Sequence, residues 1–130
     1  MKEHFVTKEI AISMEEIGFD EPCICGYNSY GALKHNIAIL SPNKDDFVSS
    51  DKYDKKINAP TWEQAIYWFC KKDIHIIVVF PQSISGCIGY ISTTEFNVIP
   101  VAGLRTIWKD RYSFYEQAIL KAIELIKSKK

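Results

Sequence analysis

Cysteine and histidine side chains are the groups in this sequence that could support metal or thiol chemistry. Cys23 and Cys25 are separated by one residue, and alternate residues of a strand point to the same face, so both thiols could reach one ion. Structural zinc sites usually place two residues between paired cysteines, so this spacing is a weak metal signal. We favour the interpretation that these cysteines pack as small buried hydrophobic residues. The other candidate groups are Cys70, Cys87, His35 and His75.

A cysteine nucleophile needs a histidine within hydrogen-bond reach and a third group that orients the histidine. The spacing of the four cysteines and three histidines does not indicate such a set. The chain also lacks GxSxG, HExxH, GxGxxG and a Walker glycine loop. The aspartates between residues 45 and 54 lack the alternate spacing of a calcium loop, and interleaved lysines would repel a cation. We therefore predict no catalytic residue, no metal and no cofactor, and favour a non-enzymatic role.

Aromatic and basic side chains form the other notable group. Tryptophan and arginine close together can stack on bases or anchor a protein interface. On a helix that buries Phe69, the neighbouring Tyr67 or Trp68 would remain partly outside. Core or boundary packing is the favoured interpretation, with a protein interface second and nucleic acid third. The candidate interaction residues are Trp68, Arg105, Trp108 and Arg111.

Charge is balanced over the whole chain and uneven at its ends. Sixteen basic and sixteen acidic residues give a formal charge of zero, which removes the global basic field that nonspecific nucleic-acid binding usually draws on. Residues 1–25 carry two lysines and six acids, whereas residues 105–130 carry seven basic residues and three acids. We interpret these runs as solvated helix faces, and the basic C-terminal end as the patch that a nucleic-acid role would use.

Length and composition predict one soluble domain over residues 1–130. A chain of 130 residues with 47% hydrophobic residues can form a core without the help of disulfide bonds, so the four cysteines are compatible with reduced thiols. No stretch has the pattern of a signal peptide or the apolar length that spans a bilayer. We therefore expect a cytoplasmic protein that does not enter membranes.

Three helices are expected from capping residues and helical periodicity. Thr7 can cap a helix that runs to about Ile17 and stops at Gly18. Thr61 and Ser113 are each followed three residues later by glutamine or glutamate, which is the pattern of a capping box. These caps predict helices over residues 62–72 and 114–128.

Strands are expected in the remaining apolar segments. Residues 23–30 and 32–40 are predicted to form a hairpin around Gly31, and Ile57 a short strand. The nearly continuous β-branched run 74–80 predicts a central strand covered on both faces, paired with residues 87–93. Residues 96–101 could add an edge strand broken at Pro100, and residues 41–56 have the composition of a loop.

These elements predict an α+β fold. The expected architecture is one antiparallel sheet of four to five strands packed by three helices, in the order α-β-β-α-β-β-(β)-α. No series of βαβ crossovers is visible, so a doubly wound nucleotide-binding fold is not expected.

Five groups of residues form a recognisable succession along the chain: 5–7, 19–23, Ala59-Pro60-Thr61-Trp62-Glu63-Gln64-Ala65 with Trp68-Phe69, 89–91, and 112–118. Together they resemble a family of small uncharacterised proteins of Bacteroides-type gut bacteria, their prophages and mobile elements. The resemblance covers most of the chain, although residues 41–56 and 94–112 are longer than the family pattern suggests. It implies a genomic setting and brings no catalytic residues.

The sequence therefore favours a non-enzymatic accessory domain of bacterial or phage origin that acts through a surface contact with a protein partner or as a homodimer. The alternative is a nucleic-acid-associated module that uses the basic C-terminal patch. A cysteine-based metal or thiol site is the third hypothesis.

Overall fold

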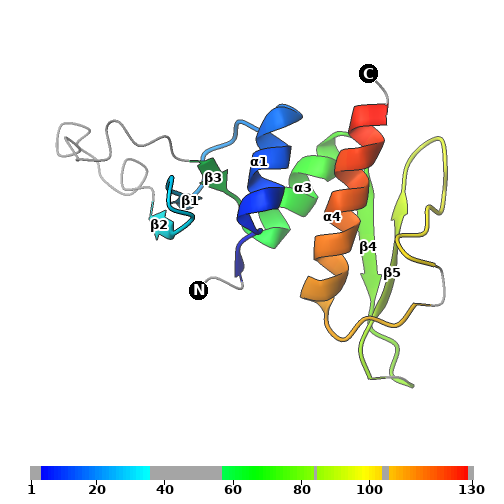
Figure 1. The fold of residues 1–130 in the computed structure, drawn as a ribbon. Coiled ribbons are helices and arrows are strands. Elements are labelled where there is room, and N and C mark those ends of the chain that lie inside the picture. The colour runs from blue at the N-terminus through cyan, green and yellow to red at the C-terminus, as the bar shows by residue number, and fades with distance from the viewer. Residues whose placement is uncertain (1–3, 36–56, 84, 104–105, 129–130) are drawn as a thin grey trace. The chain divides into compact units, whose positions relative to one another are not determined.

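The computed structural model describes residues 4–35, 57–83, 85–103 and 106–128, and it confirms the α+β class. The chain divides into two compact units, Met1–Thr61 and Trp62–Lys130 (Figure 1). A single domain over residues 1–130 stays a prediction. The predicted loop 41–56 lies outside the described residues.

The first unit begins with helix α1, Lys8–Glu16, as predicted. The Thr7 hydroxyl accepts a hydrogen bond from the Ile10 amide at 3.3 Å, which satisfies one of the free donors of the first turn. Gly18 follows the helix with φ +104°, a conformation that glycine adopts without steric cost. The helix buries Ile10, Ala11 and Met14.

A three-stranded antiparallel sheet completes the first unit. Its strands are β1, Cys25–Tyr27, β2, Leu33–His35, and β3, Ile57–Ala59, in the order β2-β1-β3. The turn between β1 and β2 is held by the Asn28 side chain, which accepts from the amides of Tyr30 and Ala32. The predicted hairpin around Gly31 and the short strand at Ile57 are both confirmed, while residues 36–40 of the predicted second strand lie outside the described residues.

The segment before α1 is tied to this sheet by buried hydrogen bonds. The Tyr27 hydroxyl donates to the Val6 carbonyl at 2.6 Å, and the Val6 amide donates to the Pro60 carbonyl at 3.0 Å. Burial, with smaller effects from Glu9 and Cys25, raises the pKa of Tyr27, so the phenol stays a hydrogen-bond donor.

The second unit is built from two helices and a two-stranded antiparallel ribbon. The helices are α3, Trp62–Lys71, and α4, Arg111–Ser128, and the strands are β4, His75–Val79, and β5, Ile88–Ser92. Both helices contact β4 and each other, and α4 also contacts β5 (Figure 1). The register pairs Ile77 with Tyr90 and Val79 with Ile88.

The prediction of a single sheet of four to five strands is wrong, because the described strands form two sheets of three and two. Residues 74–80 are therefore not the covered centre of a sheet, since β4 pairs with β5 alone among the described strands. The candidate strand 96–101 is reduced to one bridge between Ile91 and Ile99. Pro100 has no amide hydrogen to extend that ladder.

The start of α4 also differs from the prediction. The helix begins at Arg111, and the Asp110 carboxylate accepts from the Ser113 amide at 2.9 Å, so Asp110 is the N-cap instead of Ser113. This hydrogen bond is the main cause that lowers the pKa of Asp110. A carboxylate caps a helix N-terminus well because it also complements the helix dipole.

Gly89 sets the distance between α4 and the ribbon. A Cβ at this position would overlap the Phe114 ring of α4 and approach the Ile77 carbonyl oxygen at 2.6 Å. Phe114 is fully buried, and its ring also makes an edge contact with Trp108 at 5.9 Å between centroids. The glycine is needed here for close approach and not for its backbone conformation.

We predict that Gly89→Ala lowers the free energy of unfolding by roughly 1–3 kcal/mol, because the added methyl group overpacks the contact with Phe114. Urea denaturation measures the change. The same substitution in a Phe114→Leu background should cost less, since a smaller side chain leaves room for the methyl group. Equal costs in both backgrounds would contradict this packing.

Asp110→Ala should lower stability at pH 7 more than Ser113→Ala, because Asp110 supplies the cap. The pKa of Asp110 is lower in the folded state, so its contribution is complete above the unfolded-state pKa and is lost as pH falls through the folded-state value. The difference between wild type and Asp110→Ala should therefore shrink below about pH 4. Denaturation curves at several pH values measure it, and a larger effect of Ser113→Ala would refute the assignment.

Candidate functional site

The C-terminus of α3 ends in a turn that positions a polar cluster. The Asp73 amide donates to the Cys70 carbonyl at 3.1 Å, and the Ile74 amide donates to the Phe69 carbonyl at 2.9 Å. These two bonds form a Schellman motif, whose left-handed position is usually glycine. Asp73 occupies that position with φ +64°, the one described residue other than glycine with positive φ. The turn reverses the chain into β4.

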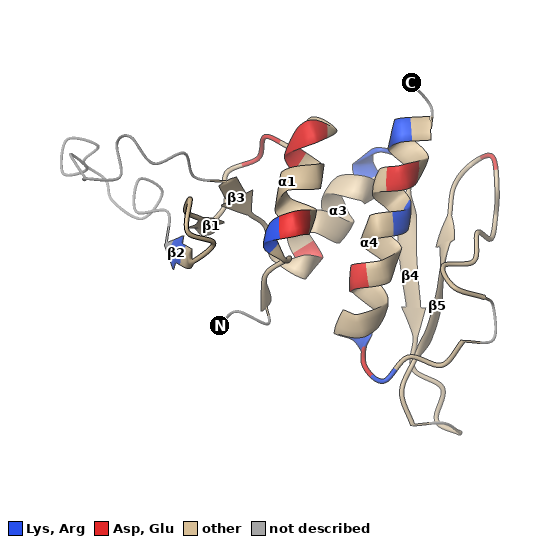
Figure 2. Ribbon diagram, in the orientation of Figure 1, with Lys and Arg blue, Asp and Glu red and all other residues tan. Residues whose placement is uncertain are grey.

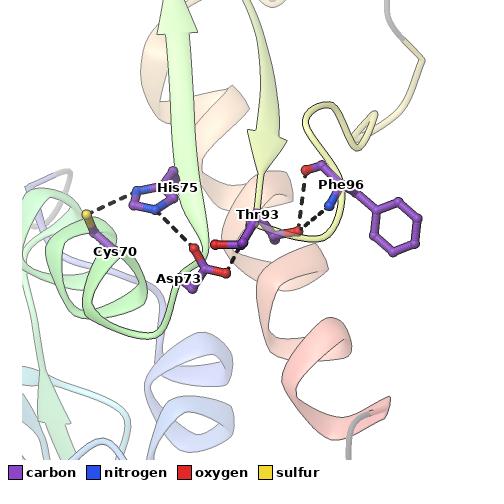
Figure 3. A network of polar contacts seen from close by, with 6 residues as sticks. Cys70, Asp73, His75, Thr93 and Phe96 are labelled. Carbon is purple, nitrogen blue, oxygen red and sulfur yellow. Dashed lines mark hydrogen bonds and ion pairs between the residues drawn. The ribbon is translucent and has the colours of Figure 1, made fainter.

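This turn brings Cys70, Asp73 and His75 together (Figure 3). The Cys70 sulfur lies 3.2 Å from His75 Nδ1, and His75 Nε2 lies 3.5 Å from Asp73 Oδ1. Figure 3 shows the imidazole ring between the sulfur and the carboxylate. The cluster is open to solvent, since Cys70 is exposed and the side chains of His75 and Asp73 are 44% and 47% exposed.

A second turn holds the carboxylate of Asp73 from the other side. The Thr94 amide donates to Asp73 Oδ2 at 2.9 Å, and this hydrogen bond is the main cause that lowers the pKa of Asp73, with a smaller effect from His75. The preceding Thr93 hydroxyl accepts from the Phe96 amide at 2.9 Å, which closes the turn after β5. Asp73 is therefore an ionised carboxylate fixed between two turns.

The order of groups is thiol, imidazole and carboxylate, which is the arrangement that a thiol nucleophile requires. The spacing of cysteines and histidines in the sequence does not reveal this set. The three residues are only three and two positions apart, but neither a strand nor an unbroken helix would bring all three side chains together. Recognising the set requires knowing that α3 ends at Lys71 and that Asp73 adopts the left-handed conformation.

The other three cysteines are buried. Cys23 and Cys25, the weak metal candidates, are each at most 1% exposed, and the Cys23 thiol donates to the Glu21 carbonyl at 3.4 Å. Burial raises the pKa of Cys25, and it does the same for Cys87 with a smaller effect from Asp110. In the part of the chain that the structure describes, no group of three cysteine, histidine or acidic side chains could hold a metal ion.

Trp68 does not lie on the surface, contrary to its place among the candidate interaction residues. Its side chain is 4% exposed, and its ring makes an edge contact with Phe69 at 5.0 Å between centroids. Tyr67 instead projects outward and is 64% exposed, with the Lys71 ammonium over its ring. The helical stripe is therefore wider than the sequence suggested, and Trp68 belongs to the core.

The two remaining candidates that the structure describes, Trp108 and Arg111, contact different partners. Trp108 is half-buried, and its backbone pairs with Cys87 through hydrogen bonds of 2.7 and 2.9 Å. Arg111 is exposed and donates to the Tyr112 hydroxyl at 3.0 Å, with its guanidinium over the Tyr112 ring. Arg105 lies outside the described residues.

Comparisons with known proteins place the chain in no family. No protein-family model, no curated protein and no solved structure matches it. Within the residues that the structure describes, the helices are too short or too polar to cross a membrane.

The burial of the two aromatic neighbours on α3 gives a paired test. Trp68→Ala should lower the free energy of unfolding by about 3–5 kcal/mol, because it removes a buried aromatic side chain. Tyr67→Ala should change it by roughly 0.5 kcal/mol or less, since the ring is exposed. Chemical denaturation of both variants measures the difference, and similar costs for the two would contradict the orientation of α3.

Proposed function

We propose that the protein is a non-enzymatic interaction domain that forms a homodimer through the outer face of the β4–β5 ribbon. This outer face consists of Ile77, Val79, Ile88 and Tyr90. The observation that carries the proposal is that the ribbon packs helices on one face and presents these apolar side chains on the other.

The direction of the side chains follows from the ladder. Gly89 faces the Phe114 ring, so its neighbours Ile88 and Tyr90 point to the opposite face of the strand. Residues directly across an antiparallel ladder share a face, so Tyr90 places Ile77 there and Ile88 places Val79 there. The outer face is thus continuous across both strands.

The apolar side chains of this face are partly exposed. Val79 is 43% exposed, and the next residue, Phe80, is 56% exposed, while Ile77, Ile88 and Tyr90 are half-buried. A two-stranded ribbon that leaves one apolar face uncovered is less stable than a sheet packed on both faces. Covering the outer face therefore supplies a driving force for association.

A second copy of the chain is the partner that this surface suits. The four residues of the outer face carry no charge, so the face has no electrostatic complementarity to a charged partner. Apolar patches buried against their own symmetry mates are typical of homodimer interfaces. Two ribbons could stack with their outer faces in contact, as packed sheets do.

The nucleic-acid alternative has less support. Acidic and basic side chains are interspersed along α4 (Figure 2), with Glu116 and Glu124 near Lys121 and Lys127. Lys121 is 3.9 Å from Glu124, which reduces its availability to a phosphate. The described part of α4 thus lacks the single-sign surface that phosphate binding favours. The bacterial or phage setting implied by the resemblance remains part of the main proposal.

Val79→Lys should weaken the dimer at least about tenfold, because the substitution places a strongly hydrated charge in the apolar contact. Sedimentation equilibrium over a range of protein concentrations measures the dissociation constant. Leu120→Lys is the matched control, since Leu120 is 41% exposed on α4 and lies outside the outer face. Circular dichroism of both variants checks that the fold is kept.

Two results would overturn the proposal. One is a wild-type chain that stays monomeric at the highest concentrations studied. The other is a dimer that Leu120→Lys weakens as much as Val79→Lys does, which would place the contact on α4.

A further inference from the structure

We propose that Cys70 is a reactive thiol that forms mixed disulfides with low-molecular-weight disulfides, with His75 as the base that accepts its proton and Asp73 as the residue that positions His75. His75 alternates with Ile77 and Val79 along β4, so it lies on the strand face that carries the proposed dimer contact. The thiol reaction itself does not require a dimer.

Accessibility singles out Cys70. It is exposed, whereas Cys23, Cys25 and Cys87 are each at most 1% exposed. A disulfide reagent in solution can therefore reach one sulfur of the four without unfolding the chain. The buried thiols also resist ionisation, because burial raises the pKa values of Cys25 and Cys87.

The imidazole is oriented to accept the proton. A carboxylate 3.5 Å from Nε2 favours the tautomer with its hydrogen on Nε2, because the N–H dipole then lies beside the negative charge. The lone pair of Nδ1 then faces the Cys70 sulfur at 3.2 Å. The proton can pass from the thiol to the ring within an existing hydrogen bond.

The left-handed backbone conformation of Asp73 is unfavourable, and the contacts of its side chain offset this cost. Residues with a Cβ disfavour the left-handed conformation, and glycine is the usual residue at this point of a Schellman motif. Asp73 nevertheless occupies it and binds both the Thr94 amide and His75. Strained residues held by specific contacts are a feature of functional sites.

The reaction balances without further components. Cys70 transfers its proton to Nδ1 of His75, and the resulting thiolate attacks one sulfur of the disulfide. A new bond forms from the Cys70 sulfur to that sulfur, and the original sulfur–sulfur bond breaks. The released thiolate takes the proton from His75. The products are the mixed disulfide on Cys70 and one molecule of the free small thiol.

The experiment uses the folded full-length chain and two probes, 5,5′-dithiobis(2-nitrobenzoic acid) and oxidised glutathione. One equivalent of thiol should react rapidly under native conditions, and intact mass with peptide mapping should place the adduct on Cys70. Cys70→Ser should abolish the rapid phase, whereas Cys87→Ser should keep it. All four thiols should react once the chain is unfolded.

Variants of His75 and Asp73 test whether these residues activate the Cys70 thiol or whether Cys70 reacts only because it is exposed. His75→Gln should slow the reaction with oxidised glutathione at pH 7 by about tenfold or more, because the base is lost. Asp73→Gly should slow it too, although glycine suits the left-handed turn and relieves the backbone strain. Asp73→Asn keeps an acceptor for the Thr94 amide but removes the charge.

The pH profile of the rate supplies a readout that a structural role alone would not change. The titratable groups that contact the imidazole are Cys70 on α3 and Asp73 in the turn, while Lys71 and Lys72 lie over the rings of Tyr67 and Trp68. The rate of wild type should depend on pH differently from the rate of His75→Gln, and Asp73→Asn should change the profile as well. Equal rates and profiles in wild type and His75→Gln would reduce Cys70 to an ordinary exposed thiol and overturn the proposal.

Discussion

The contact between Gly89 and Phe114 is the constraint on which the second unit depends. It lets α4 approach the ribbon so closely that no side chain other than hydrogen fits at position 89. That contact fixes which face of β5 is covered, and the ladder then fixes the face of every residue in β4. The burial of Ile74 and Ile91 and the outward direction of Ile77 and Tyr90 all follow from this one choice of face.

Much of the local structure could be predicted because short-range chemistry determines it. The Thr7 cap, the turn at Gly31 and the limits of α3 depend on hydrogen bonds and backbone preferences within a few residues. The number of sheets could not be predicted in this way. The run from Ile74 to Phe80 is apolar at every position except His75, and such a run suits both a covered central strand and a ribbon with one bare face.

The candidate site was harder to predict than the fold. The sequence leaves open whether Tyr67 or Trp68 lies partly outside the core, and the structure buries Trp68. Ser113 fits the capping pattern, but Asp110 is the residue that caps α4. The Cys70 cluster depends on a left-handed aspartate, and no propensity scale expects aspartate there over glycine. Sequence patterns report average preferences, whereas this cluster arises from a departure from them.

The carboxylate of Asp73 joins two turns that are 21 residues apart in the sequence, one leading into β4 and the other leaving β5. The carboxylate thus connects the two strands at the open end of the ribbon. An adduct on the sulfur of Cys70 would remove the thiol hydrogen that the His75 imidazole accepts. It would also displace the imidazole ring from its contact with the Asp73 carboxylate. Modification of the Cys70 sulfur would thereby weaken the contacts that connect the two strands. The stability of this end of the ribbon would then depend on the redox state of the surroundings.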